Sequence, residues 1–144
     1  MKKQLFAILI SLCMAFTVMA APQKDAFFKT HGFVFFFAST CPHCHAFAPV
    51  LSSVAKALNA EVLPLSFDNE PLPPFKNVLP ATTDWVTAAF QNEAIHYPAL
   101  FIANPRTSAL YSVSIGALSE VELTTRLNEL IPKIIAYETK KDVS

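Results

Sequence analysis

The sequence has little glycine, methionine or cysteine, and no excess of charge of either sign. Its 144 residues carry 11 basic and 11 acidic side chains, which provides no basic surface of the kind that binds nucleic acid. All three methionines lie at or before Met19, so the remainder of the chain has none to serve as a haem ligand. The length suits one domain rather than two.

The first residues have the pattern of an export signal. Two lysines are followed by an uncharged apolar run at residues 5–21, with small residues before a cleavage point after Ala20. This pattern predicts a secretory signal peptide at residues 1–20 and a single exported domain at residues 21–144. An uncleaved membrane anchor is the alternative, but the run is shorter than a bilayer-spanning helix of about 20 residues.

The rest of the chain predicts an α/β fold with the element order β-α-β-α-β-β-α. Apolar runs and helical spacing place strands at residues 33–38, 62–67, 99–103 and 109–115, and helices at about 42–58, 83–92 and from 120 onward. Strands that alternate with helices and end in a hairpin predict a mixed sheet with helices on both faces.

Prolines and one capping pattern mark several boundaries. Pro42 suits the first turn of a helix, and Pro64 predicts a free edge or a bulge in the second strand. Ser119 and Glu122 form the S-x-x-E pattern that begins a helix. Pro132 should kink or end that last helix.

The string CPHCH, which begins at Cys41, can serve three kinds of site. Loss of Cys13 with the signal peptide leaves Cys41 and Cys44 as the only cysteines. CxxCH also attaches haem, but a strand-rich chain without methionine makes a poor haem pocket. His43 and His45 could join the cysteines on zinc or copper, yet ligands on one helical turn rarely complete a four-coordinate site alone. We therefore expect no metal, and no cofactor other than a redox-active disulfide between the two cysteines.

The redox interpretation gives the two cysteines different roles. Cys41 lies at the predicted start of a helix, where unpaired N–H groups favour negative charge on its sulfur. Cys44 lies one turn further into the helix and is expected to be less exposed. Cys41 should therefore attack a disulfide, and Cys44 should resolve the mixed disulfide that results.

Several short motifs resemble the thioredoxin family over nearly all of the exported chain. They are CPHC after a buried strand, Pro49 in the first helix, FDNEP at 67–71, YPALF at 97–101 and GALS at 116–119. The resemblance implies a thioredoxin fold in which Pro98 is a cis-proline facing the CxxC pair. It also implies that the backbone of Tyr97 binds a substrate strand, beside Thr40, which replaces the tryptophan of thioredoxins.

Two departures from that family concern proton transfer. Phe35 replaces the buried acid that assists the resolving thiol, and Pro64 replaces a lysine near the end of the second strand. Water or His45 could then take the proton of Cys44, although His45 also fits a solvated helix residue. The sequence leaves these alternatives open.

Pro42 and His43 lie between the cysteines and determine the reduction potential that we expect of the pair. The same pair occurs in DsbA, a strong oxidant at about −120 mV, against about −270 mV for thioredoxin. That difference of about 150 mV corresponds to roughly 7 kcal/mol for two electrons. We expect His43 to tune the potential, with a solvated turn residue as the alternative. DsbA also carries a long helical insertion, for which the stretch from Cys41 to Pro98 has no room.

A smaller family fits the length better. CPHCHAFAPVL, Leu79-Pro80 and FIANPRT resemble the TrbB disulfide isomerases of F-type conjugative pilus assembly, over about residues 33–131. This resemblance implies a periplasmic enzyme that forms or reshuffles disulfides in exported proteins of a conjugation or type IV secretion machine. Its expected partners are cysteine-containing client proteins and a membrane redox partner that recharges the pair, and a lone domain suggests a monomer.

Other functions stay open at this stage. The alternatives are a thiol reductase for cytochrome c maturation and a non-catalytic module that binds a metal or a partner. Whether the chain works as an oxidase, an isomerase or a reductase also stays open. Phe47 and Phe75 fit either apolar contacts with a client or the core.

Overall fold

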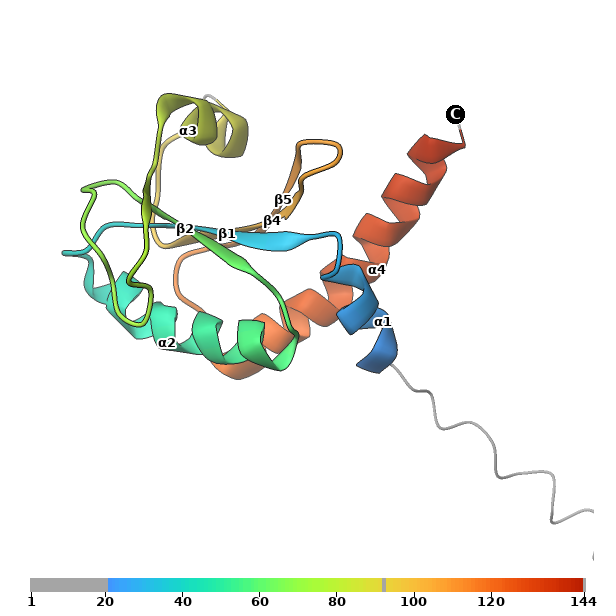
Figure 1. Ribbon diagram of the computed structural model, residues 1–144, viewed down its shortest axis with the longest axis horizontal. Coiled ribbons are helices and arrows are strands. Elements are labelled where there is room, and N and C mark those ends of the chain that lie inside the picture. Colours follow the sequence, from blue (N-terminus) through green and yellow to red (C-terminus); the bar gives the residue numbers. More distant parts are fainter. Residues whose placement is uncertain (1–20, 92, 144) are drawn as a thin grey trace, which may run out of the picture.

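The computed structural model describes residues 21–91 and 93–143, so the predicted signal peptide lies outside the described residues. Figure 1 shows the elements along the chain. They are α1 (Ala21–Phe27), β1 (Gly32–Phe37), α2 (Pro42–Ala57), β2 (Val62–Ser66), β3 (Leu79–Pro80), α3 (Thr83–Phe90), β4 (Ala99–Asn104), β5 (Ala109–Ile115) and α4 (Glu120–Asp142). No helix within these two ranges is long and apolar enough to cross a bilayer.

The strands form one mixed sheet with the order β3-β2-β1-β4-β5. The central strand β1 runs parallel to β2 and antiparallel to β4, and β5 returns antiparallel to β4. Figure 1 shows α1, α2 and the first part of α4 below the sheet and α3 above it, in agreement with two separate core clusters. The predicted mixed sheet with helices on both faces is confirmed.

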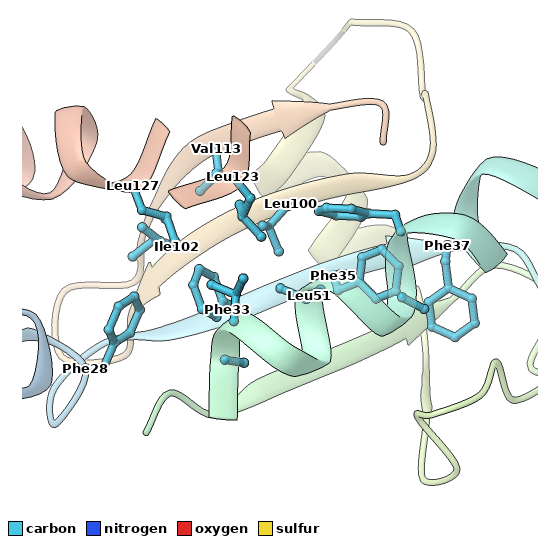
Figure 2. Close-up of a cluster of buried hydrophobic side chains, with 14 of the residues drawn as sticks. Phe28, Phe33, Phe35, Phe37, Leu51, Leu100, Ile102, Val113, Leu123 and Leu127 are labelled. Atoms are coloured by element: carbon cyan, nitrogen blue, oxygen red, sulfur yellow. The ribbon is translucent and has the colours of Figure 1, made fainter. Parts of the chain in front are cut away.

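The aromatic side chains of β1 explain why this strand is apolar throughout. Phe33, Phe35 and Phe37 belong to the core cluster shared with α2 and α4, whereas Val34 and Phe36 belong to the cluster shared with α3. Figure 2 shows the first set on the side of the sheet that Leu51 of α2 and Leu123 and Leu127 of α4 cover. Phe33, Phe35, Phe36 and Phe37 are each at most 1% exposed. Truncation of one of them to alanine would lower the free energy of unfolding by about 3–5 kcal/mol. Packing from both sides therefore fixes β1 and the point at which the chain leaves it.

Most predicted boundaries agree with the structure to within two residues. β5 has the predicted ends, and Asn59 follows α2 in a left-handed conformation with φ of 49°. The side chains of Ser119 and Glu122 form the predicted capping box. The free edge that Pro64 predicts is also confirmed, because β3 pairs with only the last two residues of β2.

Other features differ from the predictions. No element was expected at α1 or β3, yet α1 leads into Phe27 and Phe28, which are buried in the core. Pro132 does not end α4, so that part of its prediction is wrong. The buried side chains of Ile131 and Ile134 flank the exposed proline, and their packing outweighs the one backbone hydrogen bond that proline removes.

A polar cluster holds the end of α4 to the sheet. The carboxylate of Glu138 accepts hydrogen bonds from Asn104 Nδ2 at 2.9 Å, Tyr111 Oη at 2.8 Å and His31 Nε2 at 3.1 Å. Burial by itself raises the pKa of Glu138, but these hydrogen bonds outweigh that effect and hold the pKa below its ordinary value. The cluster therefore joins α4 to β4, β5 and the turn before β1.

Glu138→Ala should lower the free energy of unfolding by about 2 kcal/mol at neutral pH, because partly buried donors lose their acceptor. Urea denaturation measures this loss. Since the folded pKa of Glu138 is depressed, its stabilisation is present above the ordinary pKa of about 4.3 and is lost as the pH falls through the folded value. The wild type should thus lose stability more steeply than the variant below about pH 4.

Glu129→Ala, at an exposed position of the same helix, is the matched control and should change stability by less than about 0.5 kcal/mol. An equal loss in both variants would contradict the stabilising role of the polar cluster.

Candidate active site

Cys41 begins α2 as its N-cap residue. Pro42 occupies the first turn, where its missing N–H removes no helical hydrogen bond. The backbone N–H of Cys44 donates a hydrogen bond to Cys41 Sγ at 3.2 Å. A donor of this kind at a helix start stabilises negative charge on the sulfur. The Cys41 side chain is partly exposed, so the sulfur is within reach of another molecule.

Cys44 lies in a different environment. Its side chain is 0% exposed and belongs to the same buried cluster as Phe35, Phe47 and Leu72. Burial, reinforced by the hydrogen bond with Cys41, raises the pKa of the Cys44 thiol to about 12. The two cysteines therefore form a pair with one accessible sulfur and one shielded sulfur.

Pro98 lies at the same end of the sheet as the cysteines. Phe36 pairs with Ala99 in the β1–β4 register, which places Pro98 beside the end of β1 that leads into Cys41. The peptide bond before Pro98 is cis, as the resemblance to thioredoxins implies. The carbonyl of Pro98 accepts a hydrogen bond from the N–H of Gly116 at 2.7 Å, which ties this segment to the end of β5.

The other predicted site residues lie on the surface around the pair. Tyr97 is 45% exposed, and its ring lies 5.4 Å from that of Phe67. Thr40, Pro42 and His43 are exposed, with Thr40 in the turn before Cys41 and the other two in the first turn of α2. The structure thus places the substrate-binding and tuning candidates at one end of the sheet.

His45 is turned toward the loop before the helix. Its Nε2 donates a hydrogen bond to the carbonyl of Ser39 at 2.6 Å, and its side chain is exposed. This nitrogen is therefore occupied rather than directed at Cys44. Across the described ranges, no three His, Cys, Asp or Glu side chains are grouped so that they could hold a metal ion.

Phe47 and Phe75, each of which could contact a client or belong to the core, differ in burial. Phe47 is fully buried and packs edge-on to Phe35, with ring centroids 5.8 Å apart, so it belongs to the core. Phe75 is half-buried, and its ring lies 5.7 Å from that of Phe35. The proline-rich segment before β3 therefore covers the core near Cys44 through Phe75 and the buried Leu72.

A carboxylate that sequence reasoning missed lies beside the pair. Asp68 accepts hydrogen bonds from the N–H and hydroxyl of Ser39 at 2.8 and 2.7 Å, and from the hydroxyl of Ser66 at 2.8 Å. These bonds, led by that of the Ser39 hydroxyl, lower the pKa of Asp68 to about 2. The motif FDNEP contains this aspartate, but nothing in the sequence pairs it with a serine 29 positions earlier.

Comparison with known proteins identifies the family. The sequence model of TraF, described as F plasmid transfer operon protein, matches residues 25–128. The chain belongs to the TraF family. A relative of this TraF-family chain, Protein TrbB of Escherichia coli (strain K12), is 26% identical over 98 residues, which cover 68% of this chain. The matched region covers 54% of TrbB, so the chain spans about half the length of this curated relative.

A solved structure supports the fold independently. A thiol:disulfide interchange protein of the thioredoxin family from Chlorobium tepidum TLS is similar with a TM-score of 0.53 and 20% identity, over 76% of this chain and 82% of that one. The TraF-family chain therefore has the thioredoxin fold, and the predicted resemblance to TrbB and thioredoxin-like proteins is confirmed.

The two cysteines should react very differently with an alkylating reagent. In a Cys13→Ser background, brief treatment of the reduced, folded protein with iodoacetamide at about pH 8 should add one label, on Cys41, because the buried Cys44 thiol ionises only at much higher pH. Mass spectrometry of the intact protein and of its peptides locates the label. In urea both cysteines should react. The variant Cys41→Ser is the control and should stay unlabelled when folded, whereas rapid labelling of Cys44 in the folded protein would contradict this assignment.

Proposed function

We propose that this TraF-family chain is a periplasmic thiol–disulfide oxidoreductase that forms or reshuffles disulfides in exported proteins. The main support is the position of the Cys41 sulfur, which is partly exposed at the start of α2 and accepts a hydrogen bond from the N–H of Cys44. A sulfur stabilised in this way is both an attacking group and a good leaving group. The Cys41–Cys44 disulfide would be the redox group, with no further cofactor.

In the proposed reaction the Cys41 thiolate attacks one sulfur of a client disulfide. A bond forms between Cys41 and the client, the client disulfide breaks, and the other client sulfur leaves as a thiolate. A second client thiolate can then attack the mixed disulfide, which frees Cys41 and rearranges the client without net oxidation. Alternatively, the Cys44 thiolate attacks Cys41, so that the Cys41–Cys44 disulfide forms and the client retains two electrons.

A client segment would bind in extended form beside Pro98. The support is the placement of Pro98 at the end of β1 that leads to Cys41, together with the exposed side chains of Tyr97 and Thr40 around it. Hydrogen bonds to the Tyr97 backbone would hold the client strand. His43, exposed in the first turn of α2, would tune the potential of the pair.

The family supports a proposal for the cellular role. TraF is described as an F plasmid transfer operon protein, which supports action on cysteine-containing clients of a conjugation or type IV secretion machine. A membrane redox partner would recharge the Cys41–Cys44 pair. The predicted signal peptide supports the periplasm as the compartment, and we propose that the exported domain acts as a monomer.

Refolding of scrambled ribonuclease, whose disulfides are mispaired, tests the proposed activity. The purified protein should speed recovery of ribonuclease activity, and Cys41→Ser should reduce the rate to that of the uncatalysed reaction because the attacking sulfur is lost. Cys44→Ser should retain part of the reshuffling, since Cys41 remains, but should lose transfer of the disulfide itself. A fully active Cys41→Ser variant would contradict these roles. A wild-type protein that neither reshuffles ribonuclease nor reduces insulin would favour the non-catalytic module.

A further inference from the structure

The carboxylate of Asp68 is held in one position beside the CxxC motif. One of its oxygens accepts both bonds from Ser39, two residues before Cys41, and the other accepts from the hydroxyl of Ser66 and the N–H of Glu70 at 3.3 Å. Four donors therefore fix a charge that would otherwise move freely on an exposed side chain. The loop that leads to Cys41 is attached to the end of β2 by the same bonds.

Around Cys44 the structure places mainly apolar groups. Phe35, Phe47 and Leu72 share its buried cluster, and Phe35 stands where thioredoxins have a buried acid. Burial is the largest effect that opposes ionisation of its thiol, and a backbone hydrogen bond with Ala38 favours it. Ala38 is followed in the chain by Ser39, whose N–H holds the Asp68 carboxylate, so this fixed charge lies near the thiol. The charges of Cys41 and, to the smallest extent, Asp68 also oppose ionisation of the Cys44 thiol. His45, the other candidate for taking the proton of Cys44, instead donates a hydrogen bond to the carbonyl of Ser39 in the loop before α2.

Asp68 is unsuited to take the proton of Cys44. A carboxylate whose pKa is about 2 is a very weak base, and it stays charged throughout the range in which thiols react. A fixed negative charge instead repels a second negative charge, and it therefore opposes formation of the Cys44 thiolate.

We propose that Asp68 restrains the resolving step: its charge, fixed by Ser39 and Ser66, slows the attack of Cys44 on a mixed disulfide at Cys41. Asp68 is in this sense a positioning residue, which acts through Cys44. This inference rests on the proposed function and adds to it a reason why the mixed disulfide persists. A persistent mixed disulfide gives a second client thiolate time to attack, which favours reshuffling over simple transfer of electrons.

The restrained step transfers two electrons from the protein to the client. The Cys44 thiol gives its proton to water or buffer base, and its sulfur then attacks Cys41 Sγ. The bond between Cys41 and the client sulfur breaks, the Cys41–Cys44 bond forms, and the client sulfur leaves as a thiolate that takes up a proton. The two cysteines of the protein are oxidised, and the client is reduced.

Asp68→Asn removes the charge with little change in the hydrogen bonds. The asparagine oxygen can accept from Ser39, and its Nδ2 can donate to the Ser66 hydroxyl, whose own proton can then turn from residue 68 to the carbonyl of Glu70, 3.0 Å away. Only the long bond from the Glu70 N–H is lost. Ser39→Ala is the complementary variant, because it removes one bond to the carboxylate and keeps the charge.

The test follows resolution of a small mixed disulfide on the whole protein, in a Cys13→Ser background so that Cys41 and Cys44 are its only cysteines. A single equivalent of Ellman's reagent places thionitrobenzoate on Cys41 at low pH, and a jump to higher pH then lets Cys44 release it as a yellow thiolate. Stopped-flow absorbance gives the rate from about pH 6 to about pH 10. Asp68→Asn should speed the release roughly three- to tenfold at about pH 7.5, and about 1 M salt should shrink this difference because it screens the charge.

Two controls separate charge from structure. Ser39→Ala should stay within about twofold of the wild-type rate, because Asp68 keeps its charge. Asp84→Asn, in the first turn of α3 on the other face of the sheet, removes one charge elsewhere and should leave the rate unchanged. A wild-type rate in Asp68→Asn, an acceleration that salt does not reduce, or an equal acceleration in Ser39→Ala would overturn the inference.

The ribonuclease assay distinguishes this failure from failure of the proposed function. A wild-type protein that reshuffles ribonuclease while Asp68→Asn releases thionitrobenzoate at the wild-type rate overturns only the role of Asp68. A protein that releases thionitrobenzoate faster in Asp68→Asn but never reshuffles ribonuclease supports the role of Asp68 and contradicts the proposed function.

Discussion

The start of α2 is the feature on which the rest of the site depends. Cys41 is the N-cap of this helix, and the N–H of Cys44 donates to its sulfur. The same geometry that stabilises charge on Cys41 carries Cys44 one turn inward, into the core. One local conformation therefore produces both an accessible sulfur and a shielded one, which is the asymmetry that thiol–disulfide exchange requires.

The core serves to fix that helix start in space. The aromatic side chains of β1 pack into the core on both faces of the sheet, and the chain passes directly from β1 to the turn before Cys41. Asp68 holds this turn from the side of β2, through its bonds to Ser39. At the far end of the sheet, Glu138 holds α4, whose buried leucines pack in the same cluster as α2. Core packing and the hydrogen bonds of the Asp68 and Glu138 carboxylates thus together hold the start of α2 in place.

Local patterns in the sequence were sufficient for the parts of the fold that local chemistry controls. The apolar run of β1, the proline that begins α2 and the capping box of α4 could each be predicted from neighbouring residues. The order of helices and strands, and with it the fold class, followed from these elements. The cysteines of the candidate site were identified from their spacing and from the strand before them.

Long-range contacts account for what the sequence could not reveal. Asp68 and Ser39 lie 29 positions apart, and His31 and Glu138 lie 107 apart, so no periodic pattern links them. α1 and β3 are short, with seven and two residues, and their positions depend on tertiary contacts. Pro132 illustrates the same limit, because burial of its neighbours overrides a strong local signal.

The reduction potential of the Cys41–Cys44 pair tests the central claim most directly. Equilibration of the purified protein in glutathione buffers, followed by alkylation of free thiols, measures how strongly the start of α2 stabilises the reduced form. If that stabilisation is as described, the potential should lie closer to the DsbA value of about −120 mV than to the thioredoxin value of about −270 mV. A potential at or below about −270 mV would contradict the account.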